Sequence, residues 1–356
     1  MSVYWNERVR RLSPYVPGEQ PRDRKFIKLN TNENPYPPSP KVIEAIGRAA
    51  GDGLRLYPDP ACTELREAAA RRYGVRPEQV FAGNGSDEVL AFAFGAFFEG
   101  AAAGPVLFPD ITYSFYPVYA ALWNISFRTI PLTEDFSVNV EDYRTPAGGV
   151  VLPNPNAPTG RALSAQEITS MLEYHAPYHK VVIIDEAYAA FGAESMVPRT
   201  NKYPNLLTVH TLSKSASLAG LRAGLAIGNE ELIGGLCRIR DSFNSYTVDR
   251  LAQAGAAAAL SDAAYYDEIN RRIIASRERV SAGLAELGFT VIPSAANFIF
   301  VRSPRMGGAD LFVRLRERGI LVRHFNKPRI GDFLRISIGS GKEMDALLEA
   351  CGEILK

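Results

Sequence analysis

A lysine among small and hydroxylated residues is the first chemical signal in this sequence. Lys214 lies in the run L-L-T-V-H-T-L-S-K-S-A-S-L-A-G-L-R-A-G (206–224), directly after an apolar stretch that predicts a buried strand. Burial lowers the pKa of a lysine amine and makes it a nucleophile toward carbonyl groups. The alternative is an exposed lysine in a turn, which is the commoner situation for a lysine taken alone.

Two further polar residues follow predicted strands and support the nucleophile. Asp185 ends the apolar run V-V-I-I (181–184), and Asn156 follows the run G-V-V-L (149–152). Strands that alternate with helices predict a parallel sheet, and such sheets bind ligands beyond the carboxyl ends of their strands. We therefore expect Asn156, Asp185 and Lys214 at one edge of one sheet. This grouping favours a lysine that forms a Schiff base, for which pyridoxal phosphate (PLP) is a common partner.

The chain also offers candidate residues for the ring nitrogen, the phenolic oxygen, the phosphate and the ring face of PLP. An acid that faces the ring nitrogen keeps it protonated, which suits Asp185, and Asn156 and Tyr188 are suitable hydrogen-bond donors for the phenolic oxygen. The turn G-N-G-S-D-E (83–88) between a predicted strand and helix offers free N–H groups to a phosphate, although an ordinary helix cap would explain it equally well. Further candidates are Ser213 and Arg222 for the phosphate and Tyr113 for stacking on the ring.

Composition limits the classes of protein that this chain can represent. It has 356 residues, a hydrophobic fraction of 46% and 40 basic against 39 acidic residues, which does not predict a nucleic-acid or membrane partner. Cys62, Cys237 and Cys351 are scattered and odd in number, so we expect neither disulfides nor a metal site, and we expect a reducing cytoplasm. The N-terminal residues lack the apolar core of a signal peptide.

The pattern of elements predicts an α/β fold. Residues 1–35 are expected to form an N-terminal arm, 36–245 a large domain with a mostly parallel sheet flanked by helices, and 246–356 a smaller α+β domain. The small domain should begin near a long amphipathic helix at 265–287. Arg323 and Arg335 lie at or next to strand ends there, as surface ion pairs or as two forks for an anionic substrate group.

Three motifs, in this order, carry a family resemblance over nearly the whole chain. They are P-N-P-N-A-P-T-G (153–160), I-I-D-E-A-Y (183–188) and T-L-S-K-S-A-S-L-A-G-L-R-A-G (211–224). The sequence resembles the fold-type I PLP-dependent aminotransferases, and within them the histidinol-phosphate aminotransferases. S-P-Y (13–15), L-N-T-N-E-N-P-Y-P-P (29–38), Y-P-D-P (57–60) and the two arginines support the narrower resemblance.

The resemblance implies a role for each matching residue. Lys214 would be the Schiff-base lysine and Asp185 the partner of the ring nitrogen, with Tyr57 reaching the cofactor phosphate of the other subunit of a homodimer. No metal is implied. The remaining cofactor-binding residues would be Gly85, Ser86, Asp87, Tyr113, Asn156, Tyr188, Ser213 and Arg222, and the substrate-binding residues would be Tyr15, Asn32, Glu33, Arg323 and Arg335.

The implied reaction converts L-histidinol phosphate and 2-oxoglutarate to imidazole-acetol phosphate and L-glutamate, in histidine biosynthesis. A threonine-phosphate decarboxylase and an aromatic amino acid aminotransferase on the same fold are alternatives. A PLP-fold sensor without catalysis is another, but the presence of Lys214, Asp185 and Arg222 together favours an enzyme. The sequence departs from the family pattern at Leu56, where arginine is frequent, and in D-S-F-N-S-Y-T-V-D-R (241–250), where substrate-facing residues usually lie.

Overall fold

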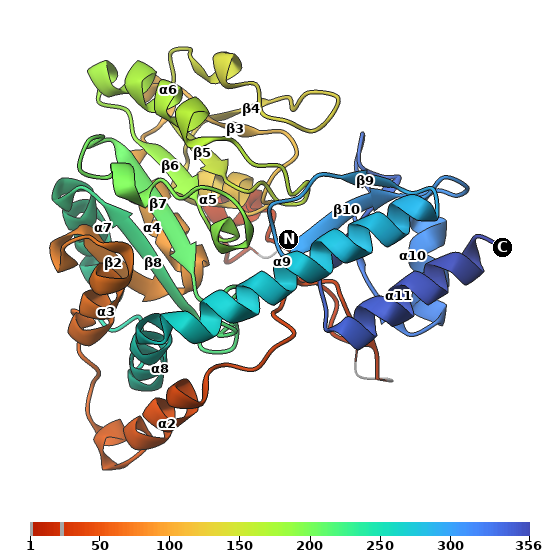
Figure 1. Ribbon diagram of the computed structural model, residues 1–356. Coiled ribbons are helices and arrows are strands. Elements are labelled where there is room, and N and C mark those ends of the chain that lie inside the picture. Colours follow the sequence, from red (N-terminus) through yellow and green to blue (C-terminus); the bar gives the residue numbers. More distant parts are fainter. Residues whose placement is uncertain (1–2, 22–24) are drawn as a thin grey trace.

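The computed structural model describes residues 3–21 and 25–356, and its centre is a seven-stranded sheet (Figure 1). Six strands run in the same direction, and β8 alone is antiparallel to its two neighbours, β2 and β7. The strand order across the sheet is β2 (Val80–Asn84), β8 (Ala223–Gly228), β7 (Leu206–Thr211), β6 (Val182–Asp185), β5 (Gly149–Pro153), β3 (Val106–Pro109) and β4 (Phe127–Ile130).

The inner strands of this sheet are buried along their whole length. Every residue of β3, β5, β6, β7 and β8 is buried, which explains their continuous apolar runs because helices cover both faces of the sheet. The sequence predicts all of these strands except β8. Its run A-G-L-A-I-G is short and contains two glycines, so it resembles a continuation of the loop after Lys214.

Helices cover the two faces of the large sheet. One face packs against α4 (Gly85–Phe97), α5 (Tyr116–Trp123) and α7 (Glu230–Phe243), and the other packs against α6 (Ala165–His175). The β2–β8 edge packs against α3 (Thr63–Tyr73) and α8 (Arg250–Ser261), and α2 (Pro40–Ala49) lies on α8. Short 3-10 helices occur at Asp52–Arg55, Pro77–Gln79, Ala101–Ala103, Val140–Tyr143, Ala176–Tyr178, Ala189–Phe191 and Val197–Arg199.

The C-terminal part forms a second layer of antiparallel strands and helices. Its sheet has the order β12 (Arg323–His324), β13 (Phe333–Ser337), β10 (Phe298–Arg302) and β9 (Thr290–Ile292). Two short strands, β1 (Ile27–Lys28) and β11 (Ile320–Leu321), pair in parallel beside it. The long helix α9 (Ala263–Glu286) extends from the large layer into this one, where α10 (Gly308–Glu317) and α11 (Gly341–Ile354) also lie (Figure 1).

The α/β fold with a smaller C-terminal antiparallel sheet confirms the predicted fold class. The predicted domain limits stay a prediction. α8 packs on α2 and α3, and Leu29 from the predicted arm joins the apolar core of the C-terminal layer. The arm also contains the short helix α1 (Glu7–Arg11), while its residues 1–2 and 22–24 lie outside the described residues.

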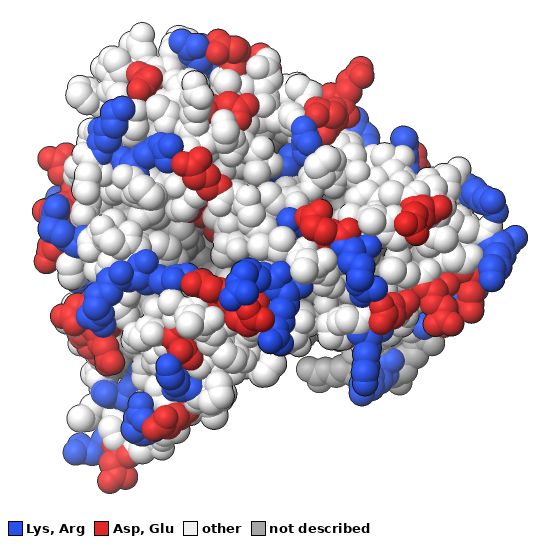
Figure 2. Space-filling model, in the orientation of Figure 1, with Lys and Arg blue, Asp and Glu red and all other residues white. Residues whose placement is uncertain are grey.

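The surface carries mixed charge on the face in Figure 2, where acidic and basic residues alternate without a large patch of one sign. Within residues 3–21 and 25–356, no helix is long and apolar enough to cross a membrane. The same residues contain no group of three or more His, Cys, Asp or Glu side chains placed to hold a metal ion.

Candidate active site

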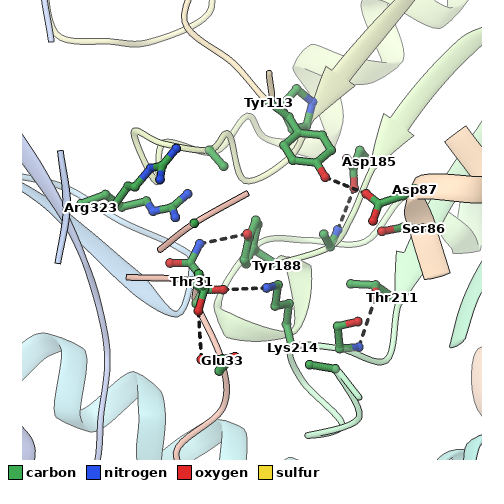
Figure 3. Close-up of a pocket in the computed structure, with 18 of the residues that line it drawn as sticks. Thr31, Glu33, Ser86, Asp87, Tyr113, Asp185, Tyr188, Thr211, Lys214 and Arg323 are labelled. Atoms are coloured by element: carbon green, nitrogen blue, oxygen red, sulfur yellow. Dashed lines mark hydrogen bonds between the residues drawn. The ribbon is translucent and has the colours of Figure 1, made fainter. Parts of the chain in front are cut away.

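Lys214 lies three residues beyond β7, at the wall of a cavity between the large sheet and the C-terminal layer. Its Nζ donates a hydrogen bond to the carbonyl oxygen of Thr31 at 3.0 Å (Figure 3). Burial, and then the positive charge of Arg335, lower the pKa of Lys214 from 10.5 to about 8. A useful fraction of this amine is therefore uncharged near neutral pH, and an uncharged amine is nucleophilic.

The cavity gathers nearly all of the predicted site residues. All of them except Gly85, Asn156 and Tyr57 line it. They come from the N-terminal segment, from turns that follow strands of the large sheet, and from β12 and β13. The carboxyl edge of the large sheet thus forms one wall, as the sequence predicts.

Asp185 ends β6 at the floor of the cavity and is only 5% exposed. Tyr116 donates its hydroxyl to Oδ2 of Asp185 at 3.0 Å, and the N–H of Ala187 donates to Oδ1 at 3.1 Å. Burial raises the pKa of Asp185 to about 6, because it outweighs the two hydrogen bonds that lower it. A buried carboxyl with this pKa is suited to share a proton with a basic ring nitrogen.

A donor-rich corner forms where β2 passes into α4. Ser86 lies in the first turn of α4, and the helix begins here because Gly85 adopts a positive φ of 76°. A side chain at Gly224 on β8 would meet the backbone of Gly85 at 2.3 Å, so glycine is needed for β8 to lie this close. Free N–H groups and the helix dipole make such a corner favourable for a phosphate.

Three charged or hydroxyl side chains complete this corner. Arg222 donates to Oδ2 of Asp87 at 2.9 Å. Tyr113 donates to Oδ1 of the same carboxylate at 2.6 Å (Figure 3). Ser213 is buried, and its Oγ has no hydrogen-bond partner among the described residues. The carboxylate of Asp87 therefore holds Arg222 and Tyr113 in place, while Ser213 keeps a hydroxyl donor available.

Two arginines enter the cavity from the C-terminal layer. Arg323 and Arg335 are directly opposite each other in the β12–β13 pairing. Arg335 donates to the carbonyl oxygen of Asn30 at 2.9 Å, while its buried Nε has no partner among the described residues. Burial, partly offset by Tyr188 and reinforced by Arg323, lowers the pKa of Arg335. A pair of adjacent guanidinium groups is suited to bind a phosphate or carboxylate.

The N-terminal segment supplies the side chains opposite Lys214. Asn32 donates to the hydroxyl oxygen of Tyr188 at 2.9 Å, which leaves the Tyr188 proton free to donate. Glu33 accepts hydrogen bonds from Lys28 at 2.6 Å and from Thr31 at 2.9 Å. Burial acts to raise the pKa of Glu33, but these bonds outweigh it and the pKa is lowered. Tyr15 stacks on Phe115 with ring centroids 4.3 Å apart.

Three predicted residues lie outside the cavity lining. Gly85 directly precedes Ser86 and, with its positive φ, forms the backbone turn at the start of α4. Asn156 is buried and donates its amide hydrogens to the carbonyl oxygen of Ile111 at 3.0 Å and to the hydroxyl oxygen of Thr159 at 2.9 Å. Its Oδ1 has no partner in the part of the chain that the structure describes. Tyr57 is 77% exposed, on the surface of the chain. Its predicted contact with a second subunit stays a prediction.

The residues fit a flat, phosphorylated ring with an aldehyde. The Oγ of Ser213, at the cavity wall, is buried and has no partner among the described residues, which is uncommon in folded proteins unless a ligand or water completes it. Tyr113 offers an aromatic face, Asp185 an acid for a ring nitrogen and Lys214 an amine for the aldehyde. Each group of such a ring has a chemical counterpart in this site.

Comparison with known families agrees with this geometry. The model of the family described as aminotransferase class I and II matches residues 24–351. The chain belongs to the class I and II aminotransferases. This membership covers both layers and includes every predicted site residue except Tyr15.

This aminotransferase is similar over its full length to curated histidinol-phosphate aminotransferases. It is 56% identical to histidinol-phosphate aminotransferase 1 of Bordetella parapertussis, over 99% of each chain. It is 54% identical to the histidinol-phosphate aminotransferase of Clostridium acetobutylicum, over 100% of each chain. A solved structure of histidinol-phosphate aminotransferase from Sinorhizobium meliloti in complex with PLP is similar at 26% identity and a TM-score of 0.88, covering 100% of this chain and 98% of that one.

The structure of this aminotransferase also adds site residues that the sequence did not indicate. Tyr116 bonds Asp185 from the start of α5, and Thr31 accepts from Lys214 through a backbone carbonyl. Tyr116 lies three residues after Tyr113 in an aromatic cluster, which is a weak signal, and a carbonyl leaves no signal in sequence. The unusual 241–250 stretch places Tyr246 against Tyr57, with ring centroids 4.6 Å apart.

Proposed function

We propose that this aminotransferase uses PLP to transfer the amino group of L-histidinol phosphate to 2-oxoglutarate, giving imidazole-acetol phosphate and L-glutamate in histidine biosynthesis. The observation that carries the proposal is the Arg323–Arg335 pair in the cavity that also contains Lys214. The names of the full-length relatives, at 54–56% identity, support the same substrate.

Different residues of the site would bind different groups of the cofactor. Lys214 would hold the aldehyde carbon, Asp185 the ring nitrogen and Tyr113 the ring face. The N-terminal turn of α4 with Ser86, together with Ser213 and Arg222, would hold the phosphate. Tyr188 would donate its hydroxyl proton to the phenolic oxygen, while Asn156 offers Oδ1 as an acceptor.

Protein side chains then manage substrate position and proton transfer. When bound, PLP supplies an electron sink for the negative charge that develops at the amino-bearing carbon of the substrate. Arg323 and Arg335 would bind the substrate phosphate, or the carboxylate of the oxo acid. The Lys214 amine, with its pKa of about 8, would move a proton between that carbon and the cofactor. Tyr15, Asn32 and Glu33 would cover the substrate from the N-terminal side.

We further propose a homodimer in which Tyr57 contacts the cofactor phosphate of the partner subunit. Leu56, Tyr57, Phe243 and Tyr246 are large apolar residues that are 42–77% exposed in one chain, and exposed apolar groups of this size mark interaction surfaces. Arg250 supports the placement, because it donates to the carbonyl oxygen of Tyr57 at 3.0 Å. A reducing cytoplasm is also part of the proposal, since all three cysteines are free thiols.

A spectral titration tests the substrate. PLP-loaded protein is mixed with histidinol phosphate in the absence of any oxo acid, and its visible band should be replaced by that of the aminated cofactor. Added 2-oxoglutarate should restore the band and release glutamate. If the band persists with histidinol phosphate but responds to threonine phosphate or aromatic amino acids, the substrate assignment is wrong. If no band forms on adding PLP, the cofactor assignment is wrong as well.

A further inference from the structure

One loop of the C-terminal layer is anchored to the large layer by a single arginine. Arg329 lies in the loop between β12 and β13 and adopts a positive φ of 66°. Its Nη1 donates to Oδ2 of Asp110 at 3.0 Å, and its Nη2 donates to the carbonyl oxygens of Leu132 (2.8 Å) and Thr133 (2.7 Å). All three acceptors belong to segments that follow β3 and β4 of the large sheet.

Apolar packing beneath the arginine makes this contact a defined joint. Ile330, next to Arg329, is 2% exposed and packs in one cluster with Ile111, Leu132 and Phe136 of the large layer and with Phe300 and Phe333 of the C-terminal sheet. The guanidinium group of Arg329 lies 5.8 Å from the ring centre of Phe136. In Figure 1 the loop that follows β4 extends toward the C-terminal layer at this joint.

A series of hydrogen bonds connects Arg329 to the wall of the cavity that would face the cofactor. Oδ1 of Asp110 accepts from the N–H groups of Ile111 and Leu132, both at 2.9 Å, while Oδ2 accepts from Arg329. The carbonyl of Ile111 then accepts from the amide of Asn156 at 3.0 Å. Tyr113 follows two residues later and lines the cavity. The carboxylate of Asp110 thus fixes the turn that orients Asn156 and carries Tyr113.

We propose that Arg329 is a positioning residue for the cofactor ring, acting through Asp110 and the turn at 110–113 on Asn156 and Tyr113. The inference rests on the proposed function, because it assumes that PLP occupies the cavity. A lone exposed ion pair contributes little to stability. Arg329 differs from such a pair in two respects. Two of its three hydrogen bonds are to main-chain carbonyl oxygens of the large layer, and an apolar cluster with members from both layers lies beneath it. The position of its side chain therefore depends on both layers.

The test compares Arg329→Gln with a matched control, Arg279→Gln. Arg279 also joins two elements through one exposed ion pair, to Asp345 at 2.7 Å, but it lies on α9 away from the cavity. The dissociation constant of PLP from each protein is measured by absorption, together with the pH at which the bound cofactor changes its visible band. We expect Arg329→Gln to raise the dissociation constant about tenfold and to shift that pH, while Arg279→Gln changes neither.

Two further variants separate positioning from folding. Arg329→Lys keeps the charge but cannot span all three acceptors, so it should give an intermediate dissociation constant. Asp110→Asn keeps the acceptor for Ile111 and Leu132 but loses the ionic partner, and its effect should not add to that of Arg329→Gln. Unchanged PLP affinity and band in folded Arg329→Gln and Arg329→Lys would overturn the inference. Failure of the wild-type protein to bind PLP would instead reject the proposed function.

Discussion

Arg323 and Arg335 are a register pair on two antiparallel strands, so two guanidinium groups lie side by side at the cavity wall. Like charges opposite each other are destabilising in a sheet. The ring of Phe325 relieves part of this cost, since it lies 5.5 Å from the guanidinium carbon of each arginine. The buried Nε of Arg335 still has no partner within residues 3–21 and 25–356, so the pair is better suited to a bound dianion than to a purely structural role.

Replacing these arginines should therefore reduce substrate binding. Arg335→Lys and Arg323→Lys keep a charge but lose the planar fork, and each should lower kcat/KM for histidinol phosphate about 10- to 100-fold, mainly through KM. Steady-state kinetics at low and high salt measure the effect. Arg302→Lys, on β10 of the same sheet and outside the cavity lining, is the control. Equal losses in all three variants would argue against a substrate role.

The chemistry of Lys214 should depend on pH around its lowered pKa. Only the uncharged amine attacks the PLP aldehyde, so attachment to the apoprotein should accelerate about tenfold per pH unit and level off above about pH 8. Stopped-flow absorption follows the rate. Lys214→Arg should bind PLP without the covalent link. A cofactor that borohydride still fixes to the Lys214→Arg protein would contradict the assignment of Lys214.

The residues that follow long buried strands were the predictable part of the site. The run V-V-I-I places Asp185 at a sheet edge, and the run before Lys214 does the same, because a parallel sheet brings its carboxyl ends together. The exposed position of Tyr57 could not follow from its sequence alone. Its place depends on the loop between α2 and α3 and on Tyr246, nearly 200 positions later.

The contacts that tune the site could not be predicted, because they join distant segments. Tyr116 reaches Asp185 across 69 positions, and Arg329 reaches Asp110 across 219. The direction in which an amide points is equally invisible in sequence. Asn156 was predicted as a donor to the phenolic oxygen, yet both of its donors are used by Ile111 and Thr159. Strand β8 was missed because its two glycines, of which Gly224 allows close packing on Gly85, also resemble a loop.

The buried acid that follows Asp185, Glu186, should make the stability of the apoprotein depend on pH. Glu186 accepts from Ser195 and from the N–H of Met196, and burial nevertheless raises its pKa from 4.5 to about 7. The folded chain therefore binds more protons than the unfolded chain between these values. The contribution of Glu186 is fully present below about pH 4.5 and is lost as the pH rises through about 7.

Glu186→Gln removes this titration and should change stability accordingly. Relative to wild type, the variant should gain ~3 kcal/mol in free energy of unfolding between pH 4.5 and pH 8. Chemical denaturation of the apoprotein at several pH values measures the difference. Glu78→Gln, an exposed acid on a 3-10 helix, should show no such gain. His210 Nε2 lies 3.6 Å from Oε2 of Glu186, but burial lowers the pKa of His210 to about 4, so its ring is neutral in both folded proteins over most of this pH range. A pH-independent difference for Glu186→Gln would reject the raised pKa.

The proposed dimer makes a prediction that a monomer cannot satisfy. If Tyr57 serves the partner's cofactor, a chain with Tyr57→Ala and a chain with Lys214→Ala damage different halves of the same site. In a mixed dimer both defects fall in one site, and the other site combines a wild-type Lys214 with a wild-type Tyr57. Random mixing of the two inactive proteins should restore about a quarter of the wild-type activity per site.

The mixing experiment also has an internal control. The Tyr57→Ala and Lys214→Ala proteins are unfolded and refolded together, or separately and then combined without exchange, and activity is followed with PLP in excess. Combination without subunit exchange should stay inactive. A double variant carrying both changes in one chain, refolded with an equal amount of wild type, should leave about a quarter of the sites intact, because each mixed dimer then has a defect in both of its sites. If co-refolding restores nothing although native-state mass measurement shows mixed dimers, Tyr57 acts within its own subunit or not at all, because only a contact across the interface produces an intact site from two damaged chains.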